Sequence, residues 1–254
     1  MTRSLERKTA LVTGASGGIG RAIAQRLAGA GATVAVHFNS GEDRARETVD
    51  LIEQAGGEAF TLQADLMSVA SIESLFDELD SRFTDRGHSG LDILVNNAGK
   101  GNGASIAKVD EALFDLIVAS NMKSSFFVTK AALPRIPAGG RIISISSMVS
   151  VAATPQGIVY SLAKAAVNAF TRSLAAELGP RRISVNAIAP GATDTALMEP
   201  IMADPAMASW IEQMTAMGRI AHPDEIAAVA LFLASPEGGW ITGQTVQASG
   251  GMHL

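Results

Sequence analysis

Tyr160 and Lys164 are the two residues whose types and spacing most directly suggest chemistry. Tyr160 is the single tyrosine of the 254-residue chain, and Lys164 follows it by four positions. Residues four apart share one face of an α-helix, so the phenol and the ammonium would project toward one point. A free phenol has a pKa near ~10, and a neighbouring cation lowers that pKa, which suits the phenol to general acid–base catalysis. Taken alone, such a pair is more often an ordinary surface pair, so its meaning depends on the other motifs.

A glycine-rich turn near the N-terminus predicts a nucleotide site. Residues 9–13 have the pattern of a buried strand, Gly14, Gly18 and Gly20 follow, and residues 21–28 have helical periodicity. Glycines allow a tight turn and let the backbone approach a pyrophosphate at the positive end of a helix. The spacing differs from the commoner Gly-x-Gly-x-x-Gly, and a purely structural turn is the alternative. The order strand, turn, helix favours a dinucleotide site.

The chain resembles the short-chain dehydrogenase/reductase superfamily over essentially its whole length. Residues 13–20 match the cofactor turn of the family, and Asn-Asn-Ala-Gly at 96–99 matches its signature after the fourth strand. Ser147, thirteen residues before Tyr160, matches the catalytic serine, and Asn121 matches the catalytic asparagine. These matches occur in the family's order, as does the Pro-Gly step after the sixth strand. Within the family, the chain resembles 3-oxoacyl-[acyl-carrier-protein] reductase-like ketoreductases.

This resemblance implies hydride transfer between a nicotinamide and a carbonyl or secondary alcohol, with a 3-oxoacyl or other keto compound as substrate. Tyr160 would protonate the carbonyl oxygen and Ser147 would hydrogen-bond it. Lys164 would lower the Tyr160 pKa and bind the nicotinamide ribose, and Asn121 would kink its helix and hold a water that links Lys164 to solvent. Two alternatives stay open: an NAD-dependent alcohol or sugar dehydrogenase, and a catalytically silent nucleotide-sensing regulator. The second is disfavoured because the catalytic residues are all present.

The end of the second strand bears on cofactor choice. An NAD-specific site has an acid about 20 residues beyond the glycines, which binds the ribose 2′-hydroxyl. Phe38 stands at the matching position here, residues 39–40 can donate to a 2′-phosphate, and His37 or Arg44 could add positive charge. Gly17 is counter-evidence, because many NADP-dependent members have Arg or Lys there. The sequence favours NADP(H) over NAD(H).

The cofactor-binding residues implied by the resemblance lie at the carboxyl ends of the predicted strands. They are Gly14, Ser16, Gly18, Ile19, Gly20, Phe38, Asn39, Ser40, Asp65, Leu66, Asn97, Ala98, Gly99, Tyr160, Lys164, Pro190, Gly191, Thr193 and Thr195. Asp65 is expected to contact the adenine without discriminating between the two cofactors. No metal site is predicted, because the chain has no cysteine and its histidines have no second ligand at metal-binding spacing.

Alternating strand and helix patterns predict an α/β fold, with a parallel sheet and helices on both faces. Strands are predicted near 8–13, 32–37, 58–63, 91–96, 139–146, 182–188 and 244–248. Helices are predicted near 18–30, 41–55, 68–83, 110–136, 157–179 and 223–235. The resemblance implies a single Rossmann domain over 1–254, with a seven-stranded sheet in the order 3-2-1-4-5-6-7. The methionine-containing segment 192–218 is predicted to form a lid over an apolar substrate.

Composition and charge exclude other classes of protein. Hydrophobic residues make up 47% and charged residues 18%, which is typical of a well-buried enzyme rather than a disordered chain. A net charge of −5 without a basic run disfavours nucleic acid and anionic membranes as partners. The absence of cysteine excludes disulfides and a cysteine nucleophile. Residues 1–8 are charged and lack the apolar core of a signal peptide, so a cytoplasmic location is expected.

Assembly is predicted from surplus apolar residues on two helices. The segments 110–136 and 157–179 carry more apolar and small residues than one buried face requires. The resemblance implies that both pair with their counterparts across a two-fold axis, and that the C-terminal strand forms a second interface. A homotetramer is expected, with a dimer as the alternative.

Overall fold

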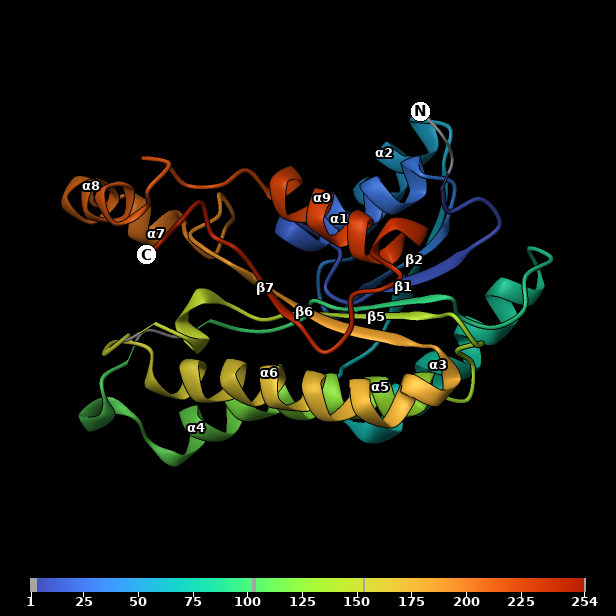
Figure 1. Ribbon diagram of the computed structural model, residues 1–254, viewed down its shortest axis with the longest axis horizontal. Coiled ribbons are helices and arrows are strands. Elements are labelled where there is room, and N and C mark those ends of the chain that lie inside the picture. The colour runs from blue at the N-terminus through green and yellow to red at the C-terminus, as the bar shows by residue number, and fades with distance from the viewer. Residues whose placement is uncertain (1–3, 102–103, 153, 254) are drawn as a thin grey trace.

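A parallel sheet occupies the centre of the structure (Figure 1). The computed structural model describes residues 4–101, 104–152 and 154–253, and within them seven strands pair in the order β3-β2-β1-β4-β5-β6-β7. The strands are β1 (Thr9–Val12), β2 (Thr33–Phe38), β3 (Glu58–Gln63), β4 (Ile93–Asn96), β5 (Arg141–Ile145), β6 (Ser184–Pro190) and β7 (Thr245–Ala248). Each strand pairing is parallel, so all carboxyl ends lie at one edge. The predicted fold class and strand order are confirmed.

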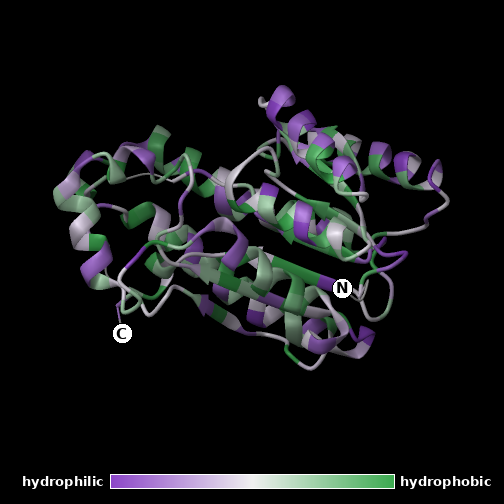
Figure 2. Cartoon of the chain, turned by 90° about the horizontal axis from the view of Figure 1, so that it is seen from above, coloured by the Kyte–Doolittle hydropathy of each residue, from purple (hydrophilic) through white to green (hydrophobic). Residues whose placement is uncertain are grey.

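Helices cover both faces of the sheet, as Figure 1 shows. One face carries α1 (Gly18–Gly29), α2 (Glu42–Gln54) and α9 (Pro223–Ala234). The other carries α3 (Val69–Thr84), α4 (Glu111–Val118), α5 (Ser124–Ala132) and α6 (Ile158–Leu178). In Figure 2 the strands are mainly hydrophobic, whereas the helices alternate between hydrophobic and hydrophilic residues, the pattern of helices with one face on a core.

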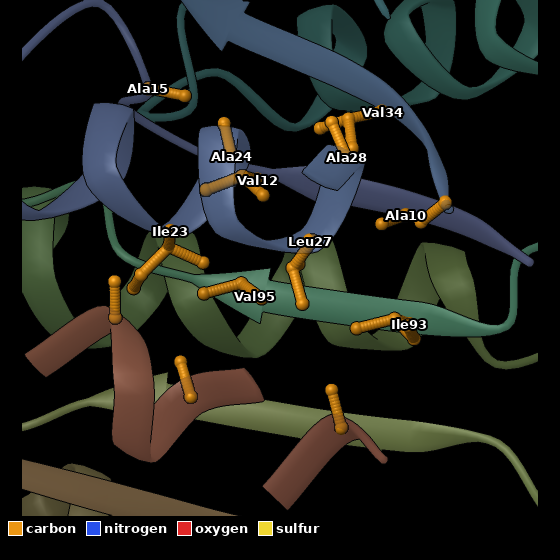
Figure 3. Close-up of a cluster of buried hydrophobic side chains, with 14 of the residues drawn as sticks. Ala10, Val12, Ala15, Ile23, Ala24, Leu27, Ala28, Val34, Ile93 and Val95 are labelled. Atoms are coloured by element: carbon orange, nitrogen blue, oxygen red, sulfur yellow. The ribbon is translucent and has the colours of Figure 1, made fainter. Parts of the chain in front are cut away.

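Two apolar layers attach the helices to the sheet. Side chains of α1, including Ile23 and Leu27, meet Val12 of β1 in the first layer (Figure 3). The second layer lies under α3, α5 and α6 and contains Leu11 and Phe76. Successive residues of a strand point to opposite faces, so Leu11 and Val12 enter different layers and β1 is buried on both sides.

The segment predicted as one helix over 110–136 is divided. After α4 the backbone forms a π-helical turn (Ala119–Lys123), and α5 then continues to Ala132. Pro134 follows two residues later and cannot continue a helix, so the helical segment ends earlier than predicted. The π-helical turn contains Asn121, where the resemblance implied a kink.

Two helices that the sequence patterns did not predict lie within 192–218. They are α7 (Glu199–Met202) and α8 (Pro205–Met214), which project beyond the sheet next to the C-terminus in Figure 1. Asp204 caps α8 by accepting a hydrogen bond from the Ala206 N–H, and Pro205 occupies its first position. Both helices are short, so neither presents a long helical period in the sequence.

The described helices also bear on membrane insertion. None of the helices within residues 4–101, 104–152 and 154–253 combines the length and apolar character that a membrane span requires. The cytoplasmic location stays a prediction.

Candidate active site

The turns that follow β1 and β4 are joined by side-chain hydrogen bonds at the carboxyl edge of the sheet. The Thr13 hydroxyl accepts from the backbone N–H groups of Asn97 (2.9 Å) and Ala98 (3.0 Å). The Asn97 amide donates to the carbonyl oxygens of Thr13 (2.9 Å) and Gly14 (3.0 Å). Two motifs that lie more than eighty residues apart in sequence therefore form one rigid unit.

The glycine turn is closely packed against that unit. Gly14 has a φ of +63°, a conformation that favours glycine. A Cβ added to Gly20 would collide with the Gly14 carbonyl oxygen and lie 2.5 Å from the Asn97 amide nitrogen. Position 20 therefore has no room for a side chain, which requires glycine there. A Cβ on Gly17, by contrast, would meet nothing within 4 Å.

A cavity of about 300 Å³ opens beside the turn. Its lining includes most of the predicted cofactor residues: Gly14, Ser16, Phe38, Asn39, Ser40, Asp65, Leu66, Asn97, Ala98 and Gly99. It also includes His37 and Arg44, which the sequence reasoning named as possible positive charges, and residues that it did not place in the site, namely Gly41, Ala64, Met67, Lys100, Ser120 and Ser124. Most of the lining comes from the carboxyl ends of β1 to β4 and from the start of α2, which is where a dinucleotide binds in a doubly wound sheet, and Ser120 and Ser124 come from the helical segment after α4.

Apart from Tyr160 and Lys164, the remaining predicted cofactor residues lie around the glycine turn or in the chain after β6 rather than in the cavity lining. Gly18 and Ile19 begin α1, and the Thr195 methyl group would lie 3.1 Å from a Cβ on Gly18. Pro190 ends β6, and Gly191 packs against the backbone of Ser249. The Thr193 hydroxyl donates to the Gly191 carbonyl oxygen (3.1 Å). The chain after β6 thus closes on the glycine turn.

Two basic residues at the cavity differ in their electrostatics. Arg44 is exposed at the start of α2 and has no ion pair within the described residues. His37 is buried, and this burial lowers its pKa to about 4, although a hydrogen bond to the Ala64 carbonyl opposes the shift. The expectation that His37 adds positive charge is therefore wrong, because its ring is neutral at neutral pH.

Tyr160 and Lys164 lie on α6 as their spacing predicted. The Lys164 ammonium is 5.6 Å from the centroid of the Tyr160 ring, and it donates to the carbonyl oxygen of Ile145 at the end of β5 (2.8 Å). Burial lowers the pKa of Lys164 to about 8. Burial also raises the pKa of Tyr160 above its ordinary value, while a hydrogen bond with Ser147 acts in the opposite direction.

The predicted role of Lys164 stays a prediction. In the structure the ammonium donates to the Ile145 carbonyl, and the net direction of the Tyr160 pKa is upward because burial dominates. The hydrogen bond from Ser147 is the contact that favours the phenolate. The Ser147 and Tyr160 hydroxyl groups are therefore close enough to bind the same oxygen atom of a ligand.

Ser147 is held by a chain of hydrogen bonds from α6. The Ser150 hydroxyl donates to the Ser147 carbonyl oxygen (2.6 Å) and accepts from the Asn168 amide (2.9 Å). Asn168 lies four residues after Lys164, on the same buried side of α6. Ser146, the alternative catalytic serine, points away, and its hydroxyl donates to the Lys164 carbonyl oxygen (3.3 Å).

Asn121 sits in the π-helical turn beside Lys164. Its amide nitrogen donates to the carbonyl oxygens of Lys100 (2.9 Å) and Ile117 (3.0 Å). Its Oδ1 atom is buried without a hydrogen-bond partner among the described residues. A Cβ on Gly99 would collide with this oxygen and lie 3.5 Å from the Lys164 ammonium, so both polar atoms border the same small space. A buried polar oxygen requires a partner, and a water between Asn121 and Lys164 fits this geometry.

The site combines an open cavity of about 300 Å³ with a buried lysine and a half-buried tyrosine and serine, and the lysine ammonium borders Gly99 of the cavity lining. Sequence reasoning predicted these three side chains as catalytic and named most of the cavity lining. It missed Asn168 and Ser150, whose only signal is that Asn168 lies one helical turn beyond Lys164.

Comparisons with known proteins agree with this geometry. The family described as enoyl-(acyl carrier protein) reductase matches residues 14–253. An uncharacterized oxidoreductase of Methylorubrum extorquens is 40% identical over 98% of this chain and 99% of its own. A hydroxynaphthalene reductase-like protein of Metarhizium majus is 38% identical over 98% of this chain and 96% of its own. The angucycline C-6 ketoreductase LanV, solved with bound NADP, is 43% identical, covers 100% of this chain and 98% of its own, and superposes with a TM-score of 0.95.

The packing of Gly20 generates a stability prediction. Gly20→Ala should destabilise the fold by about 1–3 kcal/mol, because the added methyl group meets the Gly14 carbonyl and the Asn97 amide, which cannot both move aside. Gly29→Ala, at the other end of α1, is the matched control. Its Cβ would meet nothing within 4 Å, so the better helix propensity of alanine should stabilise by up to about 1 kcal/mol. Thermal melting of both variants checks this, and a Gly20→Ala protein as stable as Gly29→Ala would contradict it.

Proposed function

The chain belongs to the short-chain dehydrogenase/reductase superfamily, and on this premise we propose that it is an NADPH-dependent ketoreductase that acts on an apolar keto substrate. The observation that carries the proposal is the grouping of Tyr160 with Ser147, to which it is hydrogen-bonded, and with Lys164, whose ammonium would lie 3.5 Å from a Cβ on Gly99 in the cavity lining. NADP bound to LanV supports the same cofactor here.

The residues around the cavity fit a nicotinamide dinucleotide. The glycine turn and the N-terminus of α1 would hold the pyrophosphate, Asp65 and Leu66 would border the adenine, and Lys164 would bind the nicotinamide ribose. When bound, the nicotinamide supplies a hydride to the carbonyl carbon. The protein's part is to hold the carbonyl and to deliver a proton.

Proton delivery follows from the burial of Tyr160 and its neighbours. The Tyr160 hydroxyl would donate its proton to the carbonyl oxygen as negative charge develops there, and the Ser147 hydroxyl would donate a hydrogen bond to the same oxygen. Lys164, with its pKa lowered to about 8, can supply a proton toward Tyr160 near neutral pH. Asn121 would hold the water through which Lys164 exchanges protons with solvent, because its Oδ1 borders the same space.

An apolar surface surrounds the Tyr160 end of the site. A small pocket beside Tyr160 is lined by α4, the residues before it and the start of α6, and it includes Val109, Leu113 and Ile117. Leu197 reaches the loop after β4, where a Cβ on Gly101 would lie 2.7 Å from its methyl group. We propose that 192–218 is the substrate lid. Fused-ring ketones fit this chemistry, and a structure of LanV holds rabelomycin.

The catalytic assignment predicts the behaviour of single substitutions. Tyr160→Phe should lower ketone reduction by about 10²- to 10⁴-fold, because the positioned acid is lost, and should leave NADPH binding close to normal. Lys164→Ala should damage both turnover and cofactor affinity. Steady-state rates with NADPH, measured on a β-keto ester and on 1-tetralone, check this and show whether the open-chain or the fused-ring ketone is preferred.

The two adjacent serines supply a matched control. Ser147→Ala should lose most of the activity, whereas Ser146→Ala should retain most of it, because the Ser146 hydroxyl faces the Lys164 carbonyl. Robust turnover by Tyr160→Phe, or equal losses in the two serine variants, would contradict the assignment.

Cofactor preference is predicted to depend on Arg44. We expect kcat/KM to favour NADPH over NADH, and Arg44→Gln to reduce that ratio by about tenfold, because it removes a charged hydrogen-bond donor for the 2′-phosphate. Arg46→Gln is the control, since Arg46 pairs with Glu42 on the exposed side of α2. Gly17→Arg should raise the ratio, because the position has room for a side chain, and Phe38→Asp should lower it. A clear preference of the unsubstituted protein for NADH would overturn the proposal.

Exposed apolar residues support a homotetramer as the proposed assembly. On the face formed by α4, α5 and α6, Phe126 is 47% and Leu162 is 59% exposed. A second patch lies near β7, the last strand of the sheet, which pairs on one side only within the described residues. Trp240, a few residues before β7, is 99% exposed. Such patches mark protein interfaces, and two separate patches fit two kinds of two-fold contact.

Light scattering tests the assembly. The molar mass measured by light scattering should be four times the chain mass of 26.2 kDa. Phe126→Glu and Trp240→Glu should each give a dimer, because each places a charge in one of the two interfaces. Leu51→Glu, at an exposed position on α2, is the control and should stay tetrameric. A monomeric unsubstituted protein would refute both interfaces.

A further inference from the structure

His37 is a buried titratable residue in the cavity wall that the proposed mechanism does not use. It lies at the penultimate position of β2, is 2% exposed and lines the cavity. A buried histidine away from a metal needs a partner for each ring nitrogen, and both nitrogens of His37 have one.

The contacts of the ring define its protonation. The backbone N–H of Gly14 donates to Nδ1 (3.0 Å), so Nδ1 carries no proton. Nε2 lies 3.1 Å from the carbonyl oxygen of Ala64 and must therefore be the protonated nitrogen that donates to it. The neutral ring required by these contacts agrees with the lowering of the His37 pKa by burial.

These two contacts join the parts of the cavity that would hold opposite ends of the adenosine diphosphate. Gly14 begins the glycine turn, and Ala64 precedes Asp65 and Leu66, which border the predicted adenine position. The Gly14 carbonyl is already held by Asn97 in the turn after β4, so His37 fixes the other polar atom of the same residue. Backbone bonds from Ala15 N–H to the His37 carbonyl (2.9 Å) and from Ala64 N–H to the Phe38 carbonyl (3.1 Å) complete the connection between the ends of β1, β2 and β3.

We propose that His37 is a positioning residue for the cofactor, which acts by holding the Gly14 amide and thereby the glycine turn at the orientation that the pyrophosphate requires. The inference deepens the proposed function, on which it rests for the presence of a nicotinamide dinucleotide. The residue touches neither the carbonyl nor the catalytic side chains, so its contribution belongs to cofactor binding and not to the chemical step.

Two substitutions separate the two ring nitrogens. In His37→Asn, the side-chain oxygen takes the place of Nδ1 and can still accept from Gly14, while the contact with Ala64 is lost. In His37→Gln, the amide nitrogen takes the place of Nε2 and can still donate to Ala64, while the acceptor for Gly14 is lost. Each variant loses one hydrogen bond, so both should melt at a similarly lowered temperature.

Cofactor titration distinguishes positioning from a merely structural role. NADPH and NADH are each titrated by nicotinamide fluorescence without a ketone present. His37→Gln should raise the Kd of the tighter cofactor roughly fivefold, the effect of one neutral hydrogen bond, and His37→Asn should stay within about twofold of the unsubstituted protein. The kcat at saturating cofactor should be unchanged in both variants.

Several outcomes would overturn the inference without touching the proposed function. These are an equal rise of Kd in both variants, no rise in His37→Gln, or a fall of kcat at saturating cofactor. Imidazole nitrogen chemical shifts of the unsubstituted protein provide a measurement that needs no variant, since a proton on Nδ1 at pH 7 would also overturn it. Failure of the proposed function would appear separately, as absent ketone reduction by the unsubstituted protein.

Discussion

The placement of Gly14 is the constraint on which the rest of the site depends. Its amide is held by His37 from β2 and its carbonyl by Asn97 from the turn after β4, so elements on both sides of β1 fix the turn that leaves it. α1 starts four residues later and packs against α9, and Gly20 has no room for a side chain. Displacement of this one residue would therefore move the helix, its partner helix and the cavity wall together.

The second half of the site is organised by α6 and the end of β5. Lys164 donates to the last residue of β5, and Asn168, one turn further, holds the loop of Ser147 through Ser150. Burying an ammonium beside a single described carbonyl acceptor is costly, and the lowered pKa of Lys164 reflects that cost. α6 thus positions Tyr160 directly and Ser147 indirectly. Both hydroxyl groups can then bind one oxygen atom of a ligand.

The strands could be predicted from local patterns, and their order from the family resemblance that motifs with fixed spacing carry. The same motifs supplied the catalytic residues, which stay a prediction. Sequence alone did not determine features that depend on partners far away in the chain. The protonation of His37 is set by Gly14 and Ala64, which are 23 and 27 residues distant. The direction of the Tyr160 pKa is set by burial, which no spacing reveals. α7 and α8 were missed because both are short, and their positions depend on tertiary contacts such as the bond from His253 N–H to the Met214 carbonyl.

The π-helical turn has a consequence for how this chain can change length. An α-helix advances by about 100° per residue, so a single residue added within one turn rotates everything after it unless the turn widens to absorb it. Ala119–Lys123 is such a widened turn, and it lets α4 and α5 face the sheet with different angular phases. Deleting one residue there would restore a regular helix but would rotate Val128 and Thr129 away from the sheet, where Thr129 accepts a hydrogen bond from Asn96. The number of residues between Asn121 and Thr129 is therefore constrained by the angular phase of the helix, in addition to the side-chain contacts of these two residues.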